Sequence, residues 1–136
     1  MNAGRFAGAA VAVFVVRTLL NYLFYGVLTH AQMEEMAAAH PGMFREVVPA
    51  FIALDLVAAI FITFLVVKAA ASFGGGIKAG VTVGILIAIL SPVLCDLYQF
   101  FSVTYFPAGA VAVDSIFQLV SHAIQGAVAA AIYKTA

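Results

Sequence analysis

The sequence predicts an all-α integral membrane protein, a four-helix bundle with both termini in the cytoplasm and a short interfacial helix in its first outer loop. Of its 136 residues, 65% are hydrophobic and 9% are charged, whereas soluble domains average about 45–50% and about 25%. Six basic residues balance six acidic ones, so no basic surface is available for nucleic acid. A single cysteine leaves no disulfide within the chain.

Four apolar runs are long enough to cross a bilayer, which takes about 20 helical residues. They cover about residues 6–29, 47–71, 77–106 and 114–133. None alternates between polar and apolar residues as a membrane strand would. Lipid offers no hydrogen-bond partner to the backbone, so the runs are expected to be helices. We expect residues 1–136 to form one transmembrane domain.

Basic residues predict the orientation of the four spans. The side shared by both termini and the second loop carries Arg5, Lys68, Lys78 and Lys134, and the other side carries Arg45 alone. Loops rich in Lys and Arg stay in the cytoplasm. We therefore expect a multi-pass protein of the inner, cytoplasmic membrane.

The connecting segments predict how the spans follow one another. The short turn 72–76 makes the second and third spans antiparallel neighbours. Pro92 removes a backbone donor and is expected to kink the third span. Ser115 and Gln118 have the spacing of a capping box, so the fourth helix is expected to begin at Asp114 or Ser115.

The outer loop 30–46 is predicted to contain the interfacial helix, ended at His40-Pro41-Gly42. Soft thioether and imidazole ligands suit copper, but the same side chains also suit contact with lipid headgroups. Whether a metal or cofactor binds is left open. The side chains that would share one face of this helix are His30, Met33, Met36, His40 and Met43.

Gly76, Gly80 and Gly84 are spaced four residues apart in the third span. Small residues allow close approach of membrane helices. They indicate either packing within the bundle or a homo-oligomer that associates through these three glycines.

Ionisable residues near the middle of a bilayer cost at least about 2.5–3.5 kcal/mol, so each should face a partner or a cavity. We expect Arg17 to contact a carboxylate, with Asp55 as first choice and Asp96 as second. The fourth span carries a polar stripe within about a third of the helix circumference, which should face the bundle interior. This stripe comprises Asp114, Gln118, Ser121, His122 and Gln125.

These residues together predict an outward-opening polar pocket that binds or passes a small solute, ion or proton. Such a pocket would indicate a function in transport. Arg17 would anchor anionic groups or neutralise an aspartate, and His122 and Asp55 would exchange protons. The residues expected to line the pocket are Arg17, Asn21, Asp55, Asp96, Gln99, Gln118, His122 and Gln125.

The length, the topology and the aromatic stretch Tyr22–Gly26 resemble small four-helix bacterial inner-membrane proteins of unknown function. The chain is also similar in size and topology to lipoprotein signal peptidase, which uses two outer-side aspartates. That resemblance implies an aspartyl dyad of Asp96 and Asp114, although the Asn-x-x-Asp-Arg and Asn-Ala-Asp motifs of the family are absent. The alternatives to a solute pocket are therefore an intramembrane aspartyl hydrolase and a structural subunit of a larger membrane complex.

Overall fold

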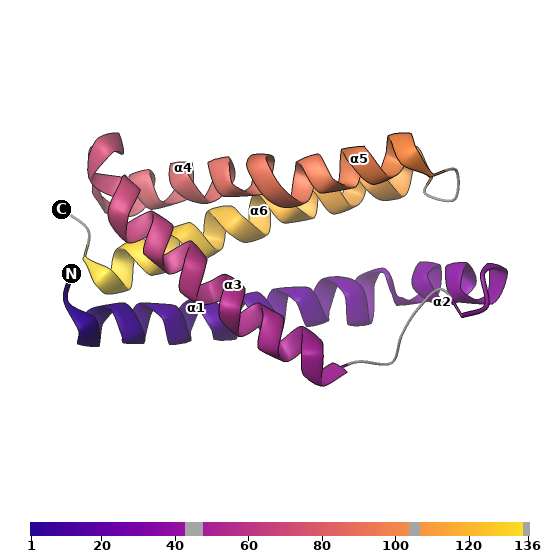
Figure 1. The fold of residues 1–136 in the computed structure, drawn as a ribbon, viewed down its shortest axis with the longest axis horizontal. Coiled ribbons are helices and arrows are strands. Elements are labelled where there is room, and N and C mark those ends of the chain that lie inside the picture. The colour runs from indigo at the N-terminus through magenta and orange to yellow at the C-terminus, as the bar shows by residue number, and fades with distance from the viewer. Residues whose placement is uncertain (43–47, 104–106, 135–136) are drawn as a thin grey trace.

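The computed structural model describes residues 1–42, 48–103 and 107–134 (Figure 1). It is all-α, and four of its helical segments are long and apolar enough to cross a membrane, as predicted for a multi-pass membrane protein. The segments are Ala3–Leu28, Pro49–Phe73, Gly76–Ser102 and Ala108–Tyr133.

Several of these segments are built from more than one kind of helix. In chain order they are α1 (Ala3–Leu23) with the π-helix η1 (Phe24–Leu28), α2 (His30–Ala39), α3 (Val48–Ala69) with the 3₁₀ helix η2 (Ala70–Phe73), α4 (Gly76–Ala88) with the π-helix η3 (Ile89–Val93) and α5 (Leu94–Ser102), and α6 (Ala108–Tyr133).

Helices α4 and α6 make the closest contact in the bundle because glycines lie where they meet. A Cβ atom at Gly84 would collide with the backbone carbonyl of His122, and one at Gly80 would collide with that of Gly126. Gly80 and Gly84 are buried, so they act in packing within the chain, the first of the two alternatives above. Gly76 begins α4 with a φ of 68°, which suits the preceding turn.

The apolar core lies where α1, α3, α4 and α6 meet, at the half of the bundle nearer the termini. Its buried members include Val13, Ile62, Val66, Val83 and Ala129. The backbone N–H of Asn2 donates to the Tyr133 hydroxyl at 3.0 Å, so both ends of the chain lie at the same end of the bundle (Figure 1). Helix α2, the end of α5 and the start of α6 lie at the opposite end.

The fourth helix begins at Ala108, well before the expected start at Asp114 or Ser115. Pro107 is extended and precedes the first turn, and its carbonyl accepts from the backbone N–H groups of Ala110 and Val111. The prediction was wrong because a proline starts a helix without needing a donor of its own. Apolar residues 108–113 then continue the helix, and Ser115 contacts another helix instead of capping this one.

The third span changes helix type at the proline where a kink was expected. The segment around Pro92 is a π-helix, Ile89–Val93, which accommodates the missing backbone donor. The third span ends at Ser102, earlier than predicted, and residues 104–106 lie outside the described part.

The outer loop does contain a short helix, and α2 ends at Ala39 just before Pro41 as expected. Its place relative to a bilayer stays a prediction.

Candidate functional site

Arg17 on α1 and Asp55 on α3 form an ion pair, which confirms the first-choice partner. The Arg17 Nε donates to Asp55 Oδ1 at 2.7 Å. Asn21 Nδ2 donates to both carboxylate oxygens, at 3.0 and 3.3 Å, and the Thr18 hydroxyl donates to Oδ2 at 3.5 Å. Asp55 is thus surrounded by donors and balanced in charge, an arrangement that holds α1 against α3.

The polar stripe on α6 faces inward, as predicted. Ser121, His122 and Gln125 are at most 4% exposed. The His122 ring bonds through Nδ1 to the Gln118 carbonyl at 2.9 Å. A carbonyl only accepts, so Nδ1 carries the hydrogen and Nε2 is the atom that can accept a proton. The hydrogen-bond partners of Asp55 in the described part of the chain are on α1, and His122 is not among them. The expected proton exchange between His122 and Asp55 is therefore not supported by a direct contact.

Two buried polar atoms deeper in the bundle have no hydrogen-bond partner within the described ranges. They are the Gln125 Oε1 and the Thr63 Oγ1, on side chains that are fully buried. Gln125 uses its Nε2 group to donate to the Ser121 hydroxyl at 2.9 Å. Such orphaned atoms are uncommon in folded proteins, so the polar stripe is only partly satisfied by the chain itself.

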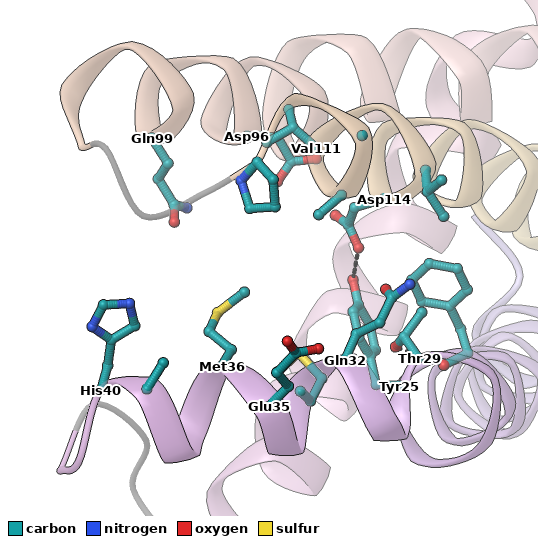
Figure 2. Close-up of a pocket in the computed structure, with 17 residues that line it drawn as sticks. Tyr25, Thr29, Gln32, Glu35, Met36, His40, Asp96, Gln99, Val111 and Asp114 are labelled. Carbon is teal, nitrogen blue, oxygen red and sulfur yellow. Dashed lines mark hydrogen bonds between the residues drawn. The ribbon is translucent and has the colours of Figure 1, made fainter.

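A cavity of about 920 Å³ opens at the end of the bundle opposite the termini. One wall comes from η1 and α2, and the other from α5 and the first turns of α6 (Figure 2). Its lining residues are Phe24, Tyr25, Thr29, Gln32, Met33, Glu35, Met36, Ala39, His40, Asp96, Gln99, Pro107, Gly109, Ala110, Val111, Val113 and Asp114.

Two carboxylates on the α5–α6 wall are tied into a hydrogen-bond network. The Tyr25 hydroxyl donates to Asp114 Oδ1 at 2.5 Å, and Gln118 Nε2 donates to the same hydroxyl oxygen at 2.9 Å. The Ser115 hydroxyl donates to Asp96 Oδ2 at 3.3 Å. The carboxyl groups of Asp96 and Asp114 themselves lie within interaction distance of each other.

Aromatic packing places Tyr25 for this role. The rings of Phe24 on η1 and Phe117 on α6 are stacked, with centroids 3.9 Å apart. Tyr25 meets both rings edge-on. The π-helical turn therefore anchors one aromatic side chain in the bundle while the next one reaches Asp114.

The expected pocket residues fall into three groups. Asp96 and Gln99 line the cavity, and Gln118 supports it from behind through Tyr25. Arg17, Asn21 and Asp55 form the separate α1–α3 cluster. His122 and Gln125 are buried deeper on α6 and do not line the cavity.

Sequence reasoning missed the α2 wall with Glu35, and it missed Tyr25, which it treated only as part of an aromatic stretch. Asp114 was expected at the start of its helix. It was also assigned to the interior stripe because of its i,i+4 spacing from Gln118, and it does line the cavity.

The residues considered for copper are divided between different surroundings. Met33, Met36 and His40 line the cavity, whereas His30 pairs with Glu34 at 3.2 Å. Met43 lies outside the described residues. Across residues 1–42, 48–103 and 107–134, no three His, Cys, Asp or Glu side chains lie close enough together to hold a metal ion.

Comparisons of the chain with protein-family models, with curated proteins and with solved structures gave no match.

Proposed function

We propose that this protein is a multi-pass protein of the cytoplasmic membrane whose cavity binds or passes a small solute, ion or proton. The observation that carries the proposal is the cavity of about 920 Å³ with Asp96 and Asp114 on its wall. Ligand sites are concave and mostly apolar, with a few polar groups placed to fix the ligand.

The basic residues support an outward-opening cavity. Arg5 and Lys134 are near the termini, and Lys68 and Lys78 flank the turn between α3 and α4. Cytoplasmic loops carry an excess of basic residues, so the termini would be cytoplasmic. The cavity, at the other end of the bundle, would then open to the outside.

A purely structural subunit is less well supported. That role is expected to leave a sealed bundle in which every polar group is paired. Here a wide cavity separates α2 from α5 and α6, and Gln125 Oε1 is buried without a partner in the described part of the chain.

A pair of phenylalanine variants tests whether the cavity binds ligands. Gly109 lines it, and a Cβ atom there would meet open space, so Gly109→Phe should fill the cavity without a clash. Ala112 is exposed on the same helix but does not line the cavity, which makes Ala112→Phe the matched control. Small cations, anions and neutral solutes would be screened by thermal unfolding of the purified protein in detergent.

We expect at least one solute to raise the melting temperature of the wild-type protein and of Ala112→Phe but not of Gly109→Phe. A ligand at about 100 times its Kd adds about 2.7 kcal/mol to stability. If every solute affects the wild-type protein and Gly109→Phe equally, the cavity does not bind them and the proposal fails.

A second candidate, an intramembrane aspartyl hydrolase, is favoured by the closeness of Asp96 and Asp114. Two adjacent carboxyl groups that share one proton can act as acid and base on a water molecule. Purified protein incubated with a mixture of apolar peptides should then release fragments detectable by mass spectrometry. Fragments released equally by Asp96→Asn, or by neither protein, would count against this reaction.

A further inference from the structure

We infer that the cavity binds an organic cation with an apolar or aromatic body, and that Asp96 and Asp114 bind its charged group. This inference names the ligand class of the site proposed above and rests on that proposal. Charge complementarity, the arrangement of the two carboxylates and the lining of the cavity each support it.

The lining of the cavity carries acidic side chains but, among the residues described, neither lysine nor arginine. Its acidic members are Glu35 on α2 and the two aspartates on the opposite wall. Arg17 is bound to Asp55 through Nε and lies outside this lining. Neighbouring carboxylates repel each other when both are ionised, and a cation between them would remove that repulsion.

The two aspartates are held in place before any ligand arrives. Tyr25 bonds one oxygen of Asp114 and Ser115 bonds one oxygen of Asp96. Figure 2 shows Glu35 and Met36 projecting from α2 into the space that faces these two aspartates. An ammonium group in that space could donate hydrogen bonds to the carboxylate oxygens that Tyr25 and Ser115 do not use.

The rest of the lining suits an apolar body better than a bare inorganic ion. Phe24, Met33, Met36 and Val111 provide apolar and polarisable contacts, and the Tyr25 ring can lie beside a cation. A small inorganic cation needs six or more oxygen ligands at about 2.0–2.6 Å. A cavity of about 920 Å³ is instead in the range of sites for drug-sized organic ligands.

Three compounds that share one body and differ in charge test this inference. Phenylbutylamine is cationic at neutral pH, phenylbutanol is neutral and phenylbutyrate is anionic. Their binding to the purified protein in detergent would be measured by isothermal titration calorimetry. The variants are Asp96→Asn and Asp114→Asn, which remove charge from the wall, and Glu34→Gln, whose exposed side chain lies outside the cavity lining.

We expect the amine to bind at least about tenfold more tightly than the alcohol or the acid, a difference of about 1.4 kcal/mol, because the attraction between opposite charges is stronger in a partly enclosed site than in water. Each aspartate variant should weaken amine binding by about tenfold, while Glu34→Gln should leave it unchanged. Unchanged binding of the alcohol to the aspartate variants would show that they remain folded.

Equal or tighter binding of the alcohol or the acid would overturn the inference, as would amine binding that both aspartate variants leave unchanged. If Gly109→Phe abolishes the binding seen in either of these outcomes, the proposed cavity still binds solutes and only its ligand class is wrong. Failure of all three compounds to bind would also overturn the inference. The wider screen with Gly109→Phe would then decide independently whether the cavity binds a solute.

Discussion

Arg17 shows how a membrane forces a charged residue to find a partner. A guanidinium at this depth is costly in lipid, and the Asp55 carboxylate within 2.7 Å compensates its charge. Asn21 and Thr18 then satisfy the carboxylate oxygens that Arg17 does not fill. The cluster links the first two spans through an ion pair and hydrogen bonds, which lipid tails cannot provide.

Replacing Arg17 by leucine should lower the free energy of unfolding by about 3 kcal/mol, because an unpaired carboxylate remains between α1 and α3. We take the lower end of the usual range since the two side chains are 20% and 14% exposed. Thermal unfolding in detergent measures the effect, and Arg5→Leu, at an exposed position, is the control.

The double variant Arg17→Leu/Asp55→Leu should recover part of this loss, because an apolar pair of similar size leaves no uncompensated charge. Equal melting temperatures for Arg17→Leu and Arg5→Leu would show that the pair adds nothing to stability. A double variant less stable than Arg17→Leu would show that Asp55 has a structural role independent of Arg17.

At the level of single residues, the sequence predicts which two side chains form an ion pair better than it predicts which polar side chains share one cavity. Arg17 and Asp55 were paired correctly because they lie in consecutive spans, the long Arg side chain can reach the carboxylate, and a charge in lipid has few other partners. The link from Tyr25 to Asp114 depends on a π-helical turn and on the stacking of Phe24 on Phe117. Neither feature has a signature in sequence spacing, so the contact between Tyr25 and Asp114 was not predicted.

At the level of helices, the contact between α4 and α6 depends on the missing side chains of glycines. Gly84 faces the His122 carbonyl so closely that a methyl group does not fit. The helix spacing that this permits brings α6, with its polar stripe, against the third span.

Gly84→Ala should lower the free energy of unfolding by about 1–3 kcal/mol, because the added Cβ forces α4 away from α6. Gly109→Ala is the matched control, since a Cβ there meets open space. It should be neutral or slightly stabilising, because alanine favours a helix over glycine. Chemical or thermal unfolding of the two variants measures the difference, and equal stabilities would contradict the close contact between α4 and α6.

The number and type of helices could be predicted from hydropathy alone, because lipid requires long apolar helices. Helix ends were harder to predict. Ser115 and Gln118 have the spacing of a cap, yet α6 begins at Ala108 because Pro107 and the apolar residues after it already form a stable start. A local capping signal cannot reveal that Ser115 has a partner on another helix, Asp96.

For the molecule as a whole, the bundle has two unlike ends. The end with the termini is joined by a hydrogen bond between Asn2 and Tyr133 and packed by the apolar core. The other end is open between α2 and the α5–α6 wall. Charge follows the same division, with Lys68 and Lys78 at the closed end and Glu35, Asp96 and Asp114 around the cavity.

The accessibility of single cysteines tests whether the open end faces outward. In a Cys95→Ser background, which removes the chain's native thiol, Ala110→Cys places a thiol on the cavity wall. Ser72→Cys places one on the turn between α3 and α4, at an exposed position. Spheroplasts would be treated with a membrane-impermeant maleimide. We expect Ala110→Cys to react and Ser72→Cys to react only after lysis; reaction of Ser72→Cys alone would contradict an outward-opening cavity.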